Sequence, residues 1–139
     1  AFDYITIDGK RTKIIKASLI GPEICNKVSL MEWFLNTNEK NVQGYDKFYW
    51  NGITTLHWSK ICNSMINDFD NYSVLNIPTS NRVSKYELLE IIKSVFNKNI
   101  NIDKNSKVEF ERCLEKTEGM SNVDIRTQLK ELKEYYYEN

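Results

Sequence analysis

The sequence lacks the short motifs that usually mark a self-sufficient active site. Its five glycines are scattered along the chain, so it contains neither a G-x-G-x-x-G turn nor a phosphate-binding P-loop. No tyrosine is followed four residues later by a lysine. The single histidine, His57, has no aspartate or serine at a catalytic spacing, and a lone histidine of this kind is more often a packing residue. We therefore expect no catalytic residue in this chain.

Cysteine is also scarce, and it occurs without the spacing of a metal or redox site. Cys25, Cys62 and Cys113 lie far apart, and no two of them form a C-x-x-C pair. Zinc ribbons and dithiol redox centres need that spacing, and no other cluster of ligating residues is present. We expect no metal site and three reduced thiols, as in a cytoplasmic protein.

An excess of one charge and long hydrophobic runs are missing as well. The 139 residues include 19 Lys and Arg and 19 Asp and Glu, whereas nucleic-acid-binding proteins usually carry a basic excess. No apolar run approaches the roughly 18 residues of a membrane span. These absences predict a protein with neither a nucleic-acid nor a membrane partner. The chain begins with Ala1 rather than Met, so we expect a processed product or a fragment.

The residues that are present have the composition of one globular domain, with 41% hydrophobic and 27% charged side chains. In the first part, Tyr4–Ile7 and Thr12–Ile20 are β-favouring runs on either side of an Asp8-Gly9 turn. The second run is almost continuously apolar, which is typical of a strand buried on both faces, and it indicates a parallel or mixed sheet. The Gly21-Pro22 pair ends it.

Helices are marked by their first turns and by apolar residues at helical spacing. Ser29–Glu32 and Ser84–Glu87 have the serine-x-x-glutamate pattern of a capping box, in which both side chains bond the backbone of the first turn. Thr54 is a third N-cap, and helices are predicted after all three and again from Ile125 to Tyr136. Extended segments are expected over 42–50, 72–77, 100–102 and 108–110. The sum is an α/β domain of mixed short strands and capped helices.

Two segments could contact a ligand, and the residues leave both interpretations open. Tyr45–Trp50 is an aromatic segment followed by Asn51 and Gly52. Aromatic faces stack on rings such as nucleobases, and a glycine allows close backbone approach. The same aromatics could instead cover the core from an edge strand. A basic run could meet a phosphate but is more typical of an exposed strand face; it consists of Lys10, Arg11, Lys13 and Lys16.

Five segments and the C-terminal tail, in this order, resemble one known family. The segments are Lys16–Glu23, Ser29–Leu35, Tyr49–Leu56, Val83–Leu89 and Glu111–Leu114. They resemble segments of extended short-chain dehydrogenases, in particular of sugar-nucleotide reductases of the dTDP-4-dehydrorhamnose reductase type. In the same order, the family segments are Arg-Thr-Ser-Ile-Ile-Gly, Gly-Leu-Phe-Glu-Trp-Phe-Leu, Trp-x-Gly-Val-Thr-Thr-Leu, Ile-Ser-Lys-Tyr-Glu-Leu-Leu and Asp-Arg-Ser-Leu. The sequence departs from this pattern at Lys16, Glu111 and Cys113, where the family has arginine, aspartate and serine.

The resemblance implies the C-terminal, substrate-binding part of a Rossmann-like protein. Residues 1–139 would form one substrate-binding domain. The N-terminal dinucleotide-binding part, with its glycine-rich turn and Tyr-x-x-x-Lys pair, would lie outside this chain. Gly21 and Pro22 would lie near the nicotinamide and the sugar, and Arg112 could approach the diphosphate, because a guanidinium donates two parallel hydrogen bonds. The nucleotide end would be lined by Trp50, Asn51, Gly52 and Thr54.

The implied function is the substrate-binding half of an NAD(P)-dependent reductase that acts on a dTDP- or UDP-linked 4-keto-6-deoxy sugar. NAD(P)H would serve the whole protein, and we expect this chain alone neither to bind it tightly nor to turn over. The expected partners are the sugar nucleotide and the missing Rossmann half, and the apolar face exposed without that half could make the chain a homo-oligomer. The alternative is a non-catalytic binding or regulatory module derived from this family.

Overall fold

The computed structural model of the chain describes residues 12–138. The expected strand at 4–7, the Asp8-Gly9 turn and the residues Lys10 and Arg11 of the basic run lie outside the described residues. Within them the elements, in chain order, are β1 (Ile14–Ile15), β2 (Leu19–Ile20), α1 (Leu30–Asn36), β3 (Asn41–Trp50), β4 (Ile53–Thr54), α2 (Thr55–Asn67), the 3₁₀ turn η1 (Phe69–Asn71), β5 (Leu75–Asn76), β6 (Val83–Ser84), α3 (Lys85–Phe96), β7 (Asn101–Glu111) and α4 (Ile125–Tyr137).

The strands form small mixed sheets, which confirms the predicted α/β class. β1 pairs with β5 and β2 with β4, both in parallel, and β3 runs antiparallel to β6 and parallel to β7. The continuous buried strand expected over residues 12–20 is wrong, because this segment passes from one partner strand to another. Lys16 N–H donates to Asn76, whereas the Ser18 carbonyl accepts from Ile53. The two short strands that result are not buried on both faces, and Leu19 is 48% exposed.

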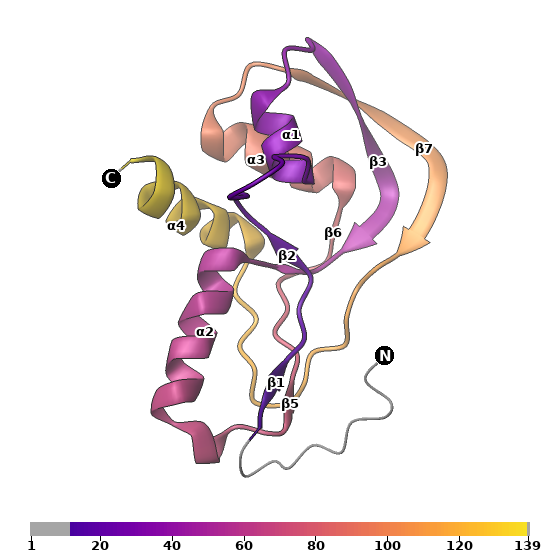
Figure 1. Cartoon of the computed structure of the whole chain (residues 1–139). Coiled ribbons are helices and arrows are strands. Elements are labelled where there is room, and N and C mark those ends of the chain that lie inside the picture. The colour runs from indigo at the N-terminus through magenta and orange to yellow at the C-terminus, as the bar shows by residue number, and fades with distance from the viewer. Residues whose placement is uncertain (1–11, 139) are drawn as a thin grey trace.

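The longest pairing joins β3 and β7, which curve together along one side of the molecule (Figure 1). Their register shifts between Tyr45 and Lys47, where residues 106–108 of β7 lie opposite Asp46 alone. The sequence predicts two short extended pieces where the structure has one strand, because residues 103–107 between them are all polar and show no apolar alternation. β3 is the central strand of its sheet. The alternative interpretation of Tyr45–Trp50, as an edge strand whose aromatic side chains cover the core, is therefore wrong about the position of the strand.

Helix starts are set by side-chain caps, with one exception. The Thr54 hydroxyl accepts from His57 N–H at 3.1 Å, and Ser84 and Glu87 form the complete capping box. The capping box predicted at Ser29–Glu32 is wrong, although α1 begins where expected: the Ser29 side chain makes no cap bond. The Glu32 carboxylate instead accepts hydrogen bonds from the N–H of Glu23 at 3.3 Å and from the amide of Asn36 at 2.9 Å.

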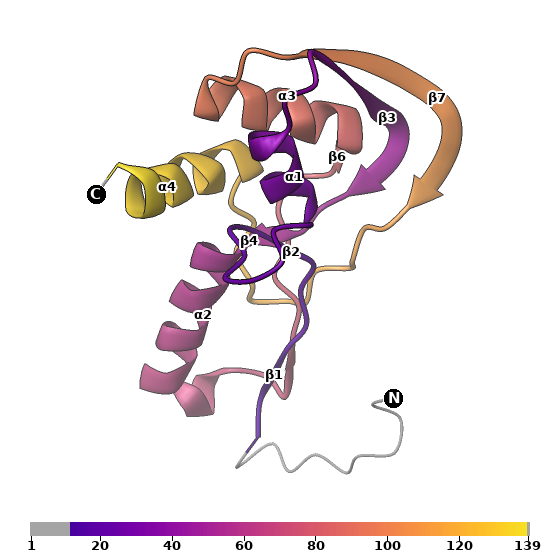
Figure 2. The ribbon, with the colours of Figure 1, turned by 45° about the horizontal axis from the view of Figure 1, so that its top comes forward.

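The core lies between α1, α3 and α4 on one side and β3 on the other, and a smaller cluster lies under α2. Figures 1 and 2 show α1 and α3 with the β3–β7 pair at one end of the molecule, and α2 with β1 and β5 at the other. α4 contacts both α3 and α2. Gln128 of α4 is fully buried: its carboxamide accepts from Thr54 N–H at 2.9 Å and donates to the Val123 carbonyl at 2.8 Å. α4 is thereby fixed to the start of α2.

Candidate ligand-binding cleft

A cleft of about 700 Å³ lies where β2 and the loop after it meet the ends of β3 and β7 and the first turns of α2 and α3. This volume is within the usual range for small-molecule sites, which are mostly apolar with a few fixed polar groups. Its apolar wall consists of Ala17, Leu19, Ile20, Leu30, Phe48, Trp50, Leu88 and Leu114.

Trp50 is held in place by both packing and a hydrogen bond. Its ring packs against the main core, and its indole N–H donates to the Ser18 hydroxyl at 2.6 Å. The two residues come from the end of β3 and from the segment before β2, so the bond joins two separate segments that line the cleft. A ring fixed in this way is preorganised for stacking on a flat ligand.

Positive charge predominates among the ionisable groups of the cleft. Lys16, Lys85 and Arg112 line it together with one carboxylate, that of Glu23. The Glu23 carboxylate accepts from Val28 N–H at 2.7 Å within its own loop. Burial, together with the charge of Arg112, lowers the pKa of Lys85 below its ordinary value. The cleft is therefore suited to an anionic ligand.

Two hydroxyl groups in the lining have no hydrogen-bond partner in the described part of the chain. The oxygens of Ser29 and Thr55 are both buried. Gly21 lies directly against Thr55, and a Cβ atom at that position would overlap the Thr55 hydroxyl. Glycine is thus needed there for the close approach of the loop to α2.

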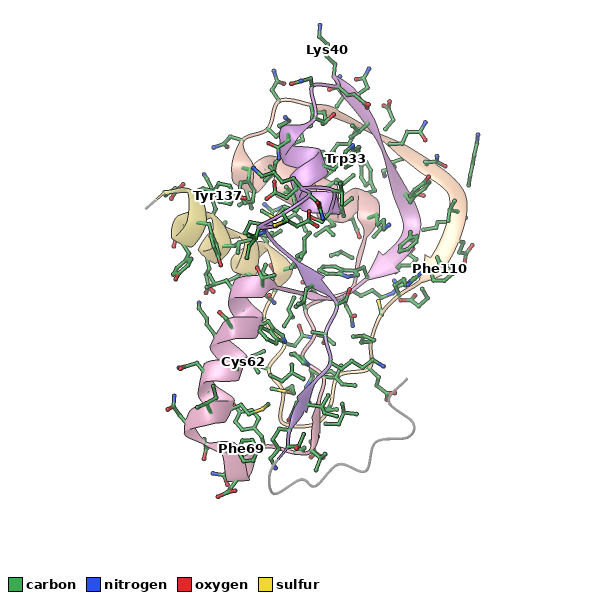
Figure 3. All side chains as sticks on the ribbon, viewed as in Figure 1. Trp33, Lys40, Cys62, Phe69, Phe110 and Tyr137 are labelled. Carbon is green, nitrogen blue, oxygen red and sulfur yellow. The ribbon has the colours of Figure 1, made fainter. Side chains whose placement is uncertain are left out.

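Four of the residues that the resemblance singled out come together in this cleft. Gly21 and Pro22 line it from the loop after β2, Trp50 from the end of β3 and Arg112 from just beyond β7. Figure 3 labels Phe110, two residues before Arg112, beside the ends of β3 and β7. Ligand contact by these residues stays a prediction.

Asn51, Gly52 and Thr54 lie beside the cleft rather than in its lining. The Asn51 amide is nearly buried and bonds the backbone of Leu114. Gly52 is buried, and a Cβ there would overlap the Ser18 carbonyl oxygen and the Trp50 ring. Thr54 is fully buried and caps α2. The contacts of these three residues stabilise the segments that line the cleft. Their direct contact with a nucleotide remains a prediction.

Sequence reasoning did not single out Lys85, Ser29 or Thr55 as lining residues, and it included Phe48 only as part of the aromatic segment. Lys85 is the first residue of α3, and its place at the cleft depends on the antiparallel pairing of Tyr49 with Ser84. That pairing joins distant parts of the sequence. The aromatic segment and the serine-lysine-tyrosine run were visible, but no local pattern indicates that they meet.

Other candidate groups lie outside the cleft. The Lys13 ammonium donates to the Tyr72 carbonyl at 2.7 Å and lies over the Phe69 ring. His57 does not line the cleft, and burial lowers its pKa. All three cysteines are free. Residues 12–138 contain no group of three or more His, Cys, Asp or Glu that could hold a metal ion, and no helix among them is long and apolar enough to cross a membrane.

The chain is an α/β domain with a cleft that is lined by aromatic side chains and by three cations. Among the solved structures that share this fold are three dTDP-4-dehydrorhamnose reductases. The enzyme from Clostridium acetobutylicum matches 88% of this chain with a TM-score of 0.70 and 13% identity. The enzyme from Bacillus anthracis, solved in complex with NADP, matches 85% with a TM-score of 0.66 and 14% identity. The enzyme from Yersinia enterocolitica matches 85% with a TM-score of 0.61 and 10% identity.

The chain therefore has the dTDP-4-dehydrorhamnose reductase fold over the matched region. The match spans 48%, 45% and 47% of the three enzymes, so the chain has about half the length of the structures it resembles. No protein-family model matches the sequence, and no curated protein does.

Proposed function

We propose that this chain is the sugar-nucleotide-binding part of an NAD(P)-dependent reductase that acts on a dTDP- or UDP-linked 4-keto-6-deoxy sugar. The observation that carries the proposal is the cleft itself, in which a fixed Trp50 ring and the cations Lys16, Lys85 and Arg112 line one hollow. A nucleoside diphosphate sugar has the matching parts: a flat base and a dianionic diphosphate. The fold shared with reductases of this substrate class supports the same assignment.

The hydride donor and the proton donor would belong to a dinucleotide-binding part of the protein outside this chain. Support comes from the half-length match and from the NADP complex of the Bacillus anthracis enzyme. This chain would contribute substrate position and specificity, which lower the barrier by fixing the keto sugar in a reactive orientation. A cytoplasmic location fits its three free thiols.

Exposed apolar side chains beside the cleft are suited to contact with that second part or, in its absence, with another copy of this chain. Leu19 lines the cleft, Ile24 and Val28 flank the lining residues, and the three side chains are 48%, 100% and 76% exposed. Burying them against a partner would remove apolar surface from water.

The first test is binding of dTDP-glucose and UDP-glucose to the complete 139-residue chain, measured by isothermal titration calorimetry. We expect saturable binding of one of them and a loss of about tenfold or more in Trp50→Ala, because the stacking surface is removed. Trp33→Ala is the matched control, since Trp33 is a partly exposed tryptophan on α1 outside the cleft (Figure 3). Absence of binding, or equal losses in the two variants, would contradict the proposal.

The second test is NADPH oxidation with a 4-keto-6-deoxy sugar nucleotide. We expect no turnover by this chain, and turnover would show that the chain contains its own cofactor site and proton donor. A longer native protein with a glycine-rich turn and a Tyr-x-x-x-Lys pair would be the reductase. A native protein that binds the sugar nucleotide but lacks both would be the non-catalytic module instead.

A further inference from the structure

Two of the cations in the cleft are supported by one pair of stacked aromatic rings. Phe48 of β3 and Phe110 of β7 are register partners, and their ring centroids lie 5.4 Å apart with the planes inclined by 25°. The Lys85 ammonium lies 4.0 Å from the centroid of Phe48, and the Arg112 guanidinium carbon lies 4.9 Å from that of Phe110. Each cation is thus attracted to the electron-rich face of a ring. Two positive groups, one from the start of α3 and one from just beyond β7, thus lie beside the same pair of rings.

These two cations differ from a neighbouring one in having no carboxylate partner. Arg82 lies 3.4 Å from the centroid of the Tyr49 ring, and its guanidinium donates to the Glu111 carboxylate at 2.9 Å. Within residues 12–138, neither Lys85 nor Arg112 forms an ion pair. The carboxylate next to Arg112 in sequence is therefore occupied by Arg82. Positive charge at Lys85 and Arg112 remains available to a ligand.

The placement of Lys85 carries a cost that a bound anion would remove. Its side chain is partly buried, and both burial and the charge of Arg112 disfavour its protonated form. An anion bound between the two groups would offset their mutual repulsion and replace the water that Lys85 has lost. The repulsion between two unpaired cations in one cleft does not itself stabilise the fold.

We propose that Lys85 and Arg112 together bind the diphosphate of the ligand, one cation for each phosphoryl group, and that the Phe48–Phe110 stack fixes their separation. The inference rests on the proposed function and adds Lys85 as a second binding residue. The two side chains are suited to different tasks. The guanidinium of Arg112 donates a planar pair of hydrogen bonds, whereas the ammonium of Lys85 acts as a compact point charge.

The test uses the complete chain and two inorganic probes, pyrophosphate and orthophosphate, titrated at constant ionic strength. Pyrophosphate is expected to bind at least tenfold more tightly than orthophosphate, because it spans both cations. Lys85→Met and Arg112→Met, which keep an unbranched stem without the charge, are each expected to weaken pyrophosphate binding by about tenfold or more. Lys85→Arg is expected to retain most of the affinity, because it restores the positive charge.

The matched control is Lys104→Ala. The Lys104 ammonium also lies over an aromatic ring, 4.9 Å from the centroid of Tyr86, but this residue does not line the cleft. Pyrophosphate affinity is expected to be unchanged in this variant. Phe110→Leu keeps an apolar side chain but removes the stacked ring, and it is expected to weaken pyrophosphate binding while the fold, followed by circular dichroism, is retained.

The outcomes separate this inference from the proposed function. Wild-type affinity of Lys85→Met for both pyrophosphate and the sugar nucleotide would overturn the role of Lys85 and leave the proposed function standing. Equal affinity for orthophosphate and pyrophosphate would also overturn the paired site. Pyrophosphate binding that depends on Lys85 and Arg112, without binding of any sugar nucleotide, would support the paired site and contradict the proposed function.

Discussion

Asn51 and Leu114 are joined by two reciprocal hydrogen bonds. The Asn51 amide donates to the Leu114 carbonyl at 2.9 Å, and Leu114 N–H donates to the Asn51 carboxamide oxygen at 2.8 Å. The bonds connect the residue after β3 with the segment after β7, so they close the pairing of the two strands beyond its last register position. Leu114 lines the cleft, and Asn51 therefore positions one of its walls.

Replacement of Asn51 by alanine should reduce the free energy of unfolding by about 2 kcal/mol, because two hydrogen bonds of about 1 kcal/mol each are lost. Urea denaturation followed by tryptophan fluorescence measures this change. Asn99→Ala is the control, since Asn99 is exposed. Equal stability of the two variants would show that the Asn51 bonds contribute little. A specific loss of ligand affinity in Asn51→Ala at unchanged stability would favour the direct contact that the sequence predicts.

Replacement of Gly52 by alanine should disturb both stability and binding. The added methyl group would overlap the Ser18 carbonyl oxygen and the Trp50 ring, so that Trp50 has to move from its hydrogen-bonded position. Overpacking of this kind typically costs about 1–3 kcal/mol. Calorimetric unfolding and nucleotide titration measure the two effects.

Gly119→Ala is the comparison for that experiment. Gly119 has a φ of +83° and no atom within 4 Å of the added methyl group, so its cost should be conformational, about 1–2 kcal/mol. Its ligand affinity should remain that of the wild type. If Gly52→Ala also kept full affinity, the close packing around Trp50 would not matter for binding.

Replacement of Ser84 by alanine should cost more stability than replacement of Ser29. The Ser84 hydroxyl accepts from Glu87 N–H at 3.1 Å within a complete capping box, and removal of such a cap costs about 1 kcal/mol. The Ser29 hydroxyl caps nothing, and its removal also deletes a buried oxygen without a partner. Thermal unfolding of the two variants measures the difference. Equal losses would mean that the hydroxyl of Ser29 caps α1 in solution.

These two serines illustrate how far local sequence determines the fold. Helix starts after Thr54 and Ser84 are predictable because the cap and the first turn lie within four residues of each other. The same pattern at Ser29 does not form a capping box, because the Glu32 carboxylate accepts hydrogen bonds from Glu23 and Asn36 instead. The bond from Glu23 depends on the conformation of the loop before α1, which the four-residue pattern does not determine. Strand lengths fail for a similar reason, since β1 and β2 are cut short by a change of partner.

The cleft was predictable only in part. Gly21, Pro22, Trp50 and Arg112 could be singled out because their motifs resemble those of a known family. Lys85 could not be singled out, because its position depends on the pairing of β6 with β3. The Phe48–Phe110 stack could not be predicted either, because it depends on the register of β3 and β7 after the bulge. Asn51, Gly52 and Thr54 are neighbours of Trp50 in sequence, but they lie outside the lining. Closeness to a lining residue in sequence does not determine which side chains face a cleft.

Acidification should destabilise the fold through His57. Burial lowers the pKa of this histidine below its ordinary 6.5, Lys60 lowers it further, and Glu131 opposes both. The unfolded chain therefore takes up the proton more readily, so stability present above pH 6.5 is lost as the pH falls through that value. The stability advantage of wild type over His57→Gln should narrow between pH 7.5 and pH 5.5 in urea denaturation. A difference in unfolding free energy between the two proteins that stays constant over this range would show that protonation of His57 does not destabilise the fold.

The Cys113 thiol should react slowly with alkylating agents until the pH is high. Burial raises the pKa of the Cys113 thiol, and the hydrogen bond with Glu111 and the negative charge of Glu111 raise it further, to about 11. Only about one molecule in a hundred therefore carries the reactive thiolate at pH 9. Glu111→Gln removes the negative charge, and the steep rise of the alkylation rate should move to lower pH. Peptide mapping after timed iodoacetamide treatment follows Cys113 separately from the exposed Cys25, whose rate should not change. Glu109→Gln serves as the control on the same strand, and an identical pH profile of Cys113 in both variants would show that Glu111 does not govern this thiol.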